Sequence, residues 1–313
     1  MGSLNPGWFV SRWNRGLPRR LWQARRLATR GPGYWRWLKS LPYGVARRLT
    51  RRTAREYPGM EAFFRGGYGL EIGGPSAIFA ANRLLPVYDR CRQLDNCNFA
   101  GRTIWHVPSE TAKDKLGLSF ARHFVAEATR LHAIPDGTYD FVLASHVLEH
   151  LANPLRAFEE WRRLLRPEGT MLVIVPDRRA TFDHRRPPTP FEHIEADYRQ
   201  NTGEDDLTHL PEILALHDLA LDPGAGSRAQ FHERSLDNAQ VRALHHHVFV
   251  PETLVRMGSA ARLRVLSVSI ERPCHIIVLA QRVDAVELDQ ARLENERFLA
   301  SDAGWRKRDP LGR

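Results

Sequence analysis

The chain has 313 residues, of which 42% are hydrophobic and 26% charged, proportions typical of a folded globular protein. No stretch approaches the roughly 20 consecutive apolar residues that a membrane-spanning helix needs. Cys91, Cys97 and Cys274 form no CxxC pair, which argues against a thiolate zinc site or a disulfide framework. Because the N-terminal residues also lack the continuous apolar core of a secretory signal, we expect a cytoplasmic protein.

The net charge of +10 is concentrated at the N-terminus. Residues 1–60 hold 14 Lys and Arg residues against one acid, whereas the rest of the chain holds 32 basic and 35 acidic residues. Five of the eight Trp residues fall in the same segment: Trp8, Trp13, Trp22, Trp35 and Trp37. Residues 18–29 and 34–52 could form short helices with Trp and Leu on one side and Arg on the other. We therefore predict a basic helical appendage over residues 1–60.

This appendage has three interpretations. Amphipathic, Arg-rich helices with Trp bind anionic membrane surfaces, and we favour this role for residues 1–56, at the inner face of the membrane. The appendage could instead be a helical layer packed on the rest of the protein. Contact with nucleic-acid phosphates is the third interpretation, and the least favoured.

From Tyr68 onward, short apolar runs alternate with helical patterns, as in a parallel sheet covered by helices on both faces. We expect seven strands, at residues 69–72, 91–95, 123–126, 141–145, 170–175, 264–270 and 275–280. The pattern predicts an α/β domain over residues 61–283. A charged helix at 285–300 and a basic tail would complete the chain over residues 284–313.

The helix between the fourth and fifth strands has clear end signals. Asn153 can cap it, Pro154 takes its first position, and Pro167 with Gly169 ends it. Residues 177–247, by contrast, show no clear period and are rich in His, Asp and Pro. Because this insertion follows the fifth strand, it would lie over the carboxyl edge of the sheet, where ligands bind in open α/β folds. We interpret it as an irregular polar lid over the substrate.

A glycine-containing turn, Glu71-Ile72-Gly73-Gly74-Pro75-Ser76, follows the first strand. Adjacent glycines let the backbone approach a bound nucleoside, and Ser76 is placed to cap a following helix. Asp95 is expected to end the second strand, near the spacing at which an acid binds ribose hydroxyls. An ordinary structural turn and a surface acid are the alternatives.

The stretch DFVLASHVLEHLANPLRAFEEWRRLLRPEGTMLVIVP, which begins at Asp140, resembles the class I S-adenosylmethionine-dependent methyltransferases. It is most similar to the type 11-like group, whose fourth strand reads DxVxxxxVLEH. The resemblance covers residues 68–176 well and 248–282 fairly. It implies a Rossmann-like, mostly parallel sheet of seven strands with the last strand antiparallel. The implied cofactor is S-adenosylmethionine, held across the first four strands.

The resemblance places Glu71 and Gly73 beside the methionine part of the cofactor, Asp95 at the ribose, Glu127 and Ala128 at the adenine ring, and Ser145 with His146 near the sulfonium. We add the neighbouring Gly74 and Asn96 to the expected cofactor-binding residues. The first turn departs from the usual ExGxGxG, since Pro75 and Ala77 replace the second and third glycines. An NAD-dependent dehydrogenase would need GxGxxG at this turn, which the chain lacks.

Methyl transfer to a hydroxyl benefits from a base. We expect that base to be His146, which follows the fourth strand, or His184 or His247 from the insertion. Glu149 and His150 are expected to be structural. In an extended segment, residues 245 and 247 would share one side. The mixed His and carboxylate content would also suit a divalent metal, but the sequence shows no known ligand spacing, and we assign no metal ligand.

These features favour O-methylation of a polar small molecule or glycan, such as a sugar or a glycolipid or polysaccharide intermediate. The alternatives are N- or C-methylation of a small metabolite and a non-catalytic relative that recruits partners. A nucleic-acid methyltransferase is not favoured, because no NPPY-like motif follows the fourth strand.

Overall fold

The computed structural model describes residues 53–103 and 120–301. The predicted helices at 18–29 and 34–52 and the predicted basic tail beyond residue 301 lie outside these ranges. The proposed appendage boundary near residue 60 therefore stays a prediction.

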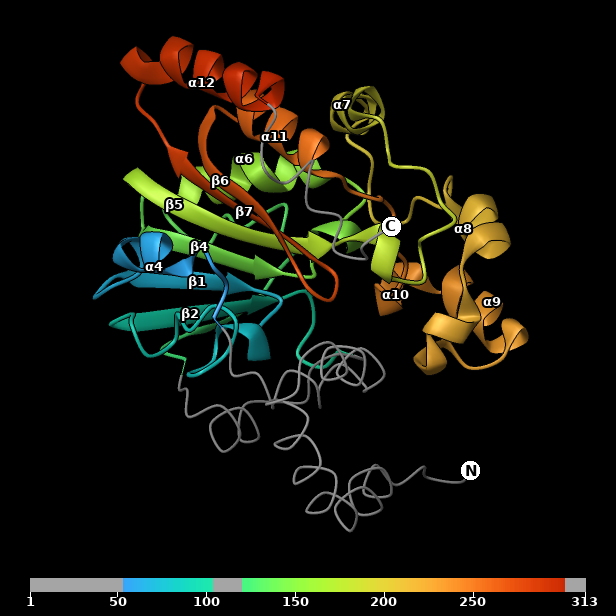
Figure 1. Ribbon diagram of the computed structural model, residues 1–313. Coiled ribbons are helices and arrows are strands. Elements are labelled where there is room, and N and C mark those ends of the chain that lie inside the picture. Colours follow the sequence, from blue (N-terminus) through green and yellow to red (C-terminus); the bar gives the residue numbers. More distant parts are fainter. Residues whose placement is uncertain (1–52, 104–119, 302–313) are drawn as a thin grey trace, which may run out of the picture. The chain divides into compact units, whose positions relative to one another are not determined.

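Seven strands of the described chain form one sheet in the order β3-β2-β1-β4-β5-β7-β6. The strands are β1 (Tyr68–Ile72), β2 (Gln93–Asn98), β3 (His123–Val125), β4 (Tyr139–Ser145), β5 (Leu165–Pro176), β6 (Leu263–Glu271) and β7 (His275–Arg282). Strand β7 is antiparallel to both neighbours, and the other pairs are parallel. The predicted Rossmann-like sheet of seven strands is confirmed (Figure 1).

Helices cover one face of this sheet. There, α6 (Pro154–Leu164) and α11 (Pro251–Ala260) bury apolar side chains such as Phe158, Trp161 and Leu254 against the strands. The opposite face packs against α4 (Tyr57–Met60) and the connection between β1 and β2, through Phe79 among others. Since fully burying a large apolar side chain contributes roughly 1.5–3 kcal/mol, these two layers hold the strand ends in fixed positions.

The predicted start of the helix after β4 is confirmed, but Pro167 and Gly169 do not end it, because α6 ends at Leu164 and both residues lie within β5. Asn153 caps α6 by accepting a hydrogen bond from the backbone N–H of Arg156 at 3.1 Å, with Pro154 in the first turn.

Near the C-terminal end of the described chain, a 3-10 turn (Ala285–Glu287) leads into α12 (Leu288–Ala300). Asn295 on α12 accepts a hydrogen bond from the backbone of Val265 in β6, which ties this helix to the sheet.

The connection between β1 and β2 differs from the expectation. No α-helix follows the glycine turn; a 3-10 turn (Ala77–Phe79) takes its place, and the Ser76 side chain makes no capping hydrogen bond. The backbone N–H of Ser76 instead donates to the Glu71 carboxylate at 2.9 Å. The buried Glu71 carboxylate thus accepts a hydrogen bond from the backbone at the place where we expected a helix to begin.

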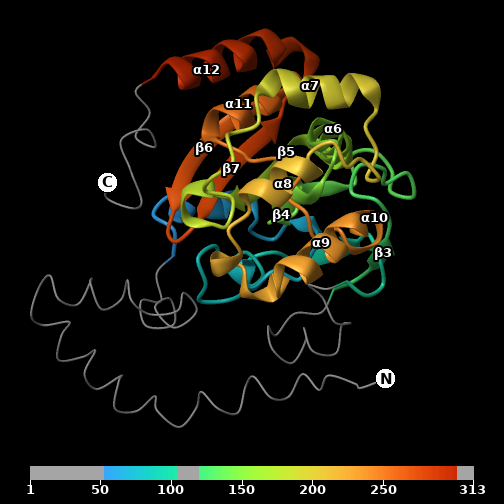
Figure 2. The same cartoon turned by 90° about the vertical axis from the view of Figure 1, so that its right-hand side faces the viewer.

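The insertion is largely helical, so the expectation of an irregular lid is wrong. It contains α7 (Phe191–Gln200), α8 (Leu210–Leu216), α9 (Arg228–Leu236) and α10 (Asn238–Val241). These helices lie beyond the ends of β4 and β5, on the side that Figure 2 turns toward the viewer. A small apolar cluster of its own stabilises the insertion: Leu210, Ile213, Ala225, Phe231 and Leu244.

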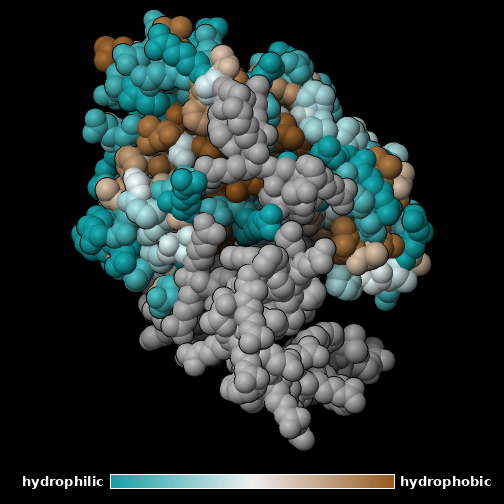
Figure 3. Space-filling model, in the orientation of Figure 1, coloured by the Kyte–Doolittle hydropathy of each residue, from teal (hydrophilic) through white to brown (hydrophobic). Residues whose placement is uncertain are grey.

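Hydrophilic side chains dominate the outer surfaces of α12 and of the insertion where Figure 3 colours them. Among the described residues, no helix reaches the length and apolarity that crossing a bilayer requires.

Candidate active site

The first turn lies at the carboxyl edge of β1. Gly73 has a φ of 74°, and a Cβ atom there would lie 2.4 Å from Cγ2 of Val147, so glycine is required both by the backbone and by the neighbouring loop. A Cβ atom on Gly74 would likewise meet the Glu71 carboxyl group at 2.2 Å. Glu71 is fully buried, and burial raises its pKa to about 7, although hydrogen bonds from Ser76 and Tyr88 act to lower it.

Asp95 does not end the second strand, and this expectation is wrong. Strand β2 continues to Asn98, and Asp95 pairs with Leu70 in the middle of β1. Its fully buried carboxylate instead accepts hydrogen bonds from the hydroxyls of Tyr68 and Tyr139 (the latter at 2.9 Å) and from Arg122 at 2.9 Å. These partners occupy the Oδ2 atom inside the domain, away from the edge where a ribose would bind.

Asn96 and Asn98 are the polar side chains that reach this edge from β2. The Asn98 amide donates to the carbonyl of Gly74 at 2.9 Å and to Oδ1 of Asn96 at 2.7 Å. Asn96 in turn donates to the carbonyl of Glu71 at 3.3 Å. The structure therefore brings the predicted Asn96 and the glycine turn together, and adds Asn98, which the sequence reasoning missed.

Glu127 and Ala128 follow β3 at the same edge. The Ala128 carbonyl accepts a hydrogen bond from the Trp161 indole at 2.9 Å, which fixes the backbone here. The Glu127 carboxylate is 41% exposed and lies 2.7 Å from Arg242 of the insertion. Arg242 also contacts Glu204 at 2.7 Å, so the insertion is tied to the predicted adenine end of the site by an arginine that the sequence did not single out.

His146 directly follows Ser145, the last residue of β4. Its φ of 54° and the hydrogen bond from its N–H to the carbonyl of Ile174 in β5 turn the chain at the sheet edge. The imidazole Nδ1 lies 3.4 Å from Oε1 of Glu149, and Nε2 lies 2.9 Å from Nδ1 of His275 at the start of β7. With 34% of its side chain exposed, His146 is accessible to a bound molecule.

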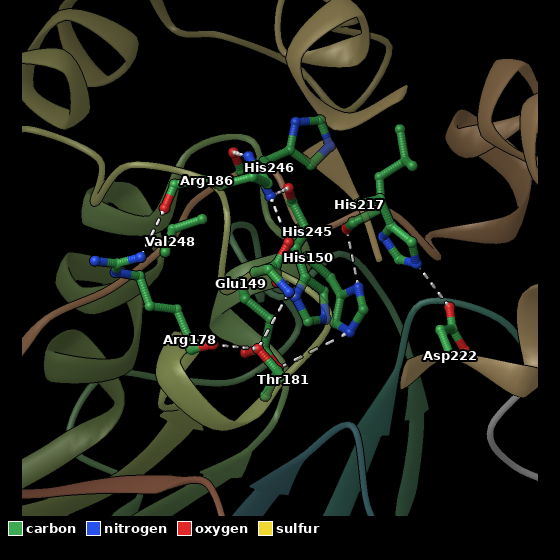
Figure 4. A network of polar contacts seen from close by, with 12 residues as sticks. Glu149, His150, Arg178, Thr181, Arg186, His217, Asp222, His245, His246 and Val248 are labelled. Atoms are coloured by element: carbon green, nitrogen blue, oxygen red, sulfur yellow. Dashed lines mark hydrogen bonds and ion pairs between the residues drawn. The ribbon is translucent and has the colours of Figure 1, made fainter. Parts of the chain in front are cut away.

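Glu149, His150 and His245 form a buried polar cluster (Figure 4), and His245 also contacts Asp183. Neither carboxylate oxygen of Glu149 has a hydrogen bond of good geometry among the described residues. Burial acts to raise the pKa of Glu149, but His146, His150 and His245 together lower it below its ordinary value. Burial also lowers the pKa of His150 to about 4, which keeps this ring neutral.

His245 bonds Asp183 from the first loop of the insertion, with 2.5 Å between Nδ1 and Oδ2. Burial lowers the pKa of His245, but the adjacent carboxylate more than offsets this and raises it above the ordinary value. Arg186 donates to Oδ1 of the same carboxylate at 3.0 Å and to the His245 carbonyl at 2.8 Å. A buried ionic network thus joins the first loop of the insertion to its last segment.

The other two predicted bases lie elsewhere. His184 contacts Asp218 at 2.9 Å, and its side chain is 37% exposed. His247 is 1% exposed and contacts the carbonyl of Ala152 at 3.2 Å, so a substrate does not reach it. We expected His245 and His247 to lie on one side of an extended segment, but this segment forms no strand. His245 contacts Asp183 and His247 contacts the Ala152 carbonyl, so the two rings do not share a site.

The strand order and the antiparallel β7 are those of the class I S-adenosylmethionine-dependent methyltransferase fold, and the DFVLASHVLEH segment at β4 has the pattern of that family. A family model described as a methyltransferase domain matches residues 85–173, from just before β2 into β5. The cofactor that a methyltransferase domain of this kind uses is S-adenosylmethionine. No curated protein matches the chain.

Solved structures of methyltransferases resemble the chain at low sequence identity. One from Aquifex aeolicus is 15% identical over 74% of this chain and 90% of that chain, with a TM-score of 0.40. One from Methanosarcina mazei is 16% identical over 72% and 98%, with a TM-score of 0.41. The 1,6-didemethyltoxoflavin-N1-methyltransferase of Burkholderia thailandensis, solved with that substrate and S-adenosylhomocysteine, is 14% identical over 85% and 91%, with a TM-score of 0.41.

Proposed function

We propose that the chain transfers the methyl group to a hydroxyl oxygen of a polar acceptor, such as a sugar or a glycolipid or polysaccharide intermediate. The contact between His146 and Glu149 carries this proposal. A hydroxyl is weakly acidic and reacts faster when a positioned base accepts its proton. An accessible imidazole with a buried carboxylate behind it suits that task, because the carboxylate orients the ring and stabilises its protonated form.

The residues at the carboxyl edge suit a nucleoside cofactor. The backbone of the turn at Gly73 and Gly74 and the side chains of Asn96, Asn98 and Glu127 would hold it, since they follow β1, β2 and β3 at one edge. When bound, S-adenosylmethionine supplies an electrophilic methyl group. His146 would then accept the acceptor's hydroxyl proton at Nε2, with the acceptor taking the place of His275 at this nitrogen and Glu149 holding the ring at Nδ1.

The insertion would bind the acceptor and exclude water. Its first loop carries the partly exposed His184 and Arg185, and the preceding Asp183 contacts His245, which lies in one cluster with Glu149 and His150 of the loop after β4. Carboxylate, imidazole and guanidinium groups match the hydroxyls of a sugar better than an apolar surface does. His184, which is partly exposed, is the second candidate for the base.

A methyl-transfer assay tests this proposal. Full-length protein is incubated with isotope-labelled S-adenosylmethionine and with sugars, amines and carboxylic acids in parallel, and the products are identified by mass spectrometry. We expect methyl ethers, and a loss of roughly 10²–10⁴-fold in rate for His146→Ala but none for the exposed His132→Ala. Methylated amines or carbons as the main product would overturn the proposal. Cofactor binding without turnover of any acceptor would favour a non-catalytic role.

We also propose that residues 1–56 bind an anionic membrane surface. The support is the excess of Arg and Trp in this segment. The full chain and a chain lacking residues 1–56 are sedimented with vesicles containing anionic lipids. We expect only the full chain to sediment with the vesicles, and equal sedimentation would contradict the proposal. Binding to duplex DNA that weakens steeply with salt, without vesicle binding, would favour nucleic acid instead.

A further inference from the structure

A second cluster of polar side chains lies within the insertion, apart from His146. His193 and Asp197 are one turn apart on α7, His209 precedes α8, and His247 lies shortly before α11. One donor atom from each of these four side chains lies within 4.8 Å of the others. Three segments that are distant in sequence thus place three imidazoles and one carboxylate around one point.

The distances between the donor atoms are those of ligands around one small cation. Nε2 of His193 lies 3.0 Å from Nε2 of His209 and 3.3 Å from Oδ2 of Asp197. Nε2 of His247 lies 3.8 Å from the same Oδ2. Four ligands at the usual zinc bond length of about 2.0–2.1 Å in a tetrahedron lie roughly 3.4 Å apart. Small adjustments of the side chains would complete such a geometry, with Nε2 of His247 exchanging its contact with the Ala152 carbonyl for the ion.

Hydrogen bonding within the chain leaves this cluster incompletely satisfied. Oδ2 of Asp197 and Nδ1 of His247 are buried and have no hydrogen-bond partner among the described residues. Leaving a buried polar atom unpaired costs about 1–3 kcal/mol. A bound cation would pair with the carboxylate oxygen, and this is the second observation, beyond residue type, that indicates a ligand.

Neighbouring groups orient the proposed ligands. The hydroxyl of Thr202 donates to the other carboxylate oxygen of Asp197 at 3.1 Å, which leaves Oδ2 directed at the imidazoles. The Asn153 amide donates to the Asp197 carbonyl at 3.0 Å. Metal ligands in proteins are commonly held in this way by a second set of hydrogen bonds.

We propose that His193, Asp197, His209 and His247 bind one divalent transition-metal ion, with Zn²⁺ as the best match. Three imidazoles and one carboxylate suit zinc and its neighbours better than Mg²⁺ or Ca²⁺, which prefer oxygen ligands. The ion joins α7 to the loop before α8 and to the segment before α11. Because Asn153 also bonds Asp197, the ion connects the insertion to the loop that carries Glu149.

The test uses the full chain after treatment with a chelator and dialysis. Isothermal calorimetry with ZnCl₂ should show one equivalent bound, and Co²⁺ in place of zinc should give the visible absorption of a tetrahedral site. Zinc at about 100 times its Kd should raise the Tm by roughly 5–10 °C. His193→Ala should abolish these effects without disturbing the core, because 40% of the His193 side chain is exposed.

Two control variants give the test its specificity. His232→Ala removes an exposed histidine of α9 and should bind zinc as the unaltered chain does. His150→Ala removes a ligand of the other cluster, Glu149, His150 and His245, and should also retain binding. The proposal is overturned if the folded full chain binds no zinc, if His193→Ala and His209→Ala bind it normally, or if His150→Ala alone removes it. Circular dichroism verifies the fold of each variant.

Discussion

Nδ1 of His146 lies 3.4 Å from Oε1 of Glu149, three residues further along the chain. The histidine is accessible and the glutamate is fully buried, so a substrate would meet the imidazole while the carboxylate stays out of reach. In this arrangement the glutamate positions the base and does not contact the acceptor.

Glu149→Gln should therefore lower kcat while the Kd for S-adenosylhomocysteine stays within about twofold. The amide keeps the shape of the side chain but removes the negative charge beside His146, and we expect a loss of roughly 10–10³-fold in kcat. Steady-state kinetics and calorimetry measure the two quantities. Glu233→Gln, on the exposed face of α9, is the matched control. A parallel loss of kcat and cofactor binding would indicate a merely structural role for Glu149.

Arg186→Ala should strongly destabilise the protein. The guanidinium is 1% exposed and pairs with Asp183 and Glu212, so its removal leaves buried charge uncompensated. We expect the free energy of unfolding to fall by about 3–5 kcal/mol. The neighbouring Arg185 is 51% exposed, and Arg185→Ala should cost less than about 1 kcal/mol. Urea unfolding measures both variants, and similar losses would contradict the anchoring role of Arg186.

Arg242→Ala should also destabilise the chain, by about 1–3 kcal/mol. Its loss leaves the carboxylate of Glu204 without its cation, and burial already raises the pKa of Glu204 to about 7 despite Arg242. Arg199→Ala, an exposed position on α7, provides the comparison in thermal and urea unfolding. An Arg242→Ala variant as stable as Arg199→Ala would show that the contact between the insertion and Glu127 is weak.

Glu71 should make stability depend on pH. The folded chain keeps this carboxyl protonated up to about pH 7, whereas the unfolded chain ionises it near the ordinary value of 4.5. Between these values the folded state binds the extra proton, so the free energy of unfolding falls as pH rises, by roughly 3 kcal/mol, and this decline ends above pH 7.

Urea unfolding at pH 5 and pH 7.5 measures this decline. Glu71→Gln should lessen it by roughly 3 kcal/mol, because the amide does not titrate, whereas the part due to Glu204, whose pKa burial also raises to about 7, should remain. The Tyr88 hydroxyl donates to the Glu71 carboxylate at 2.8 Å and so stabilises the charged form of Glu71. In Tyr88→Phe, the pH at which the decline in the free energy of unfolding ends should therefore be higher. An unchanged pH dependence in Glu71→Gln would contradict the assignment.

Features set by neighbouring residues could be predicted from the sequence. The Asn153 cap and the strand that ends at Ser145 depend on signals within about a dozen residues, and both are confirmed. Asp95 was misplaced because its partners Tyr68, Tyr139 and Arg122 come from other parts of the chain. No local pattern shows that an acid inside an apolar run will be buried and paired.

The insertion was the least predictable part for the same reason. Its helices are short, and the network around Arg186 and the small apolar cluster hold them in place through contacts between distant residues. The spacing of His193 and Asp197 is visible in the sequence, but their approach to His209 and His247 depends on the fold. His146 could be predicted, because it directly follows the recognisable fourth strand.

Calorimetric titration of the full chain with S-adenosylhomocysteine tests the central claim most directly. A class I methyltransferase site at the carboxyl edge of β1, β2 and β4 predicts one bound equivalent. His146→Ala should retain this binding, because the role proposed for His146 is to act on the acceptor. A full chain that is folded by circular dichroism and binds no S-adenosylhomocysteine would contradict the account.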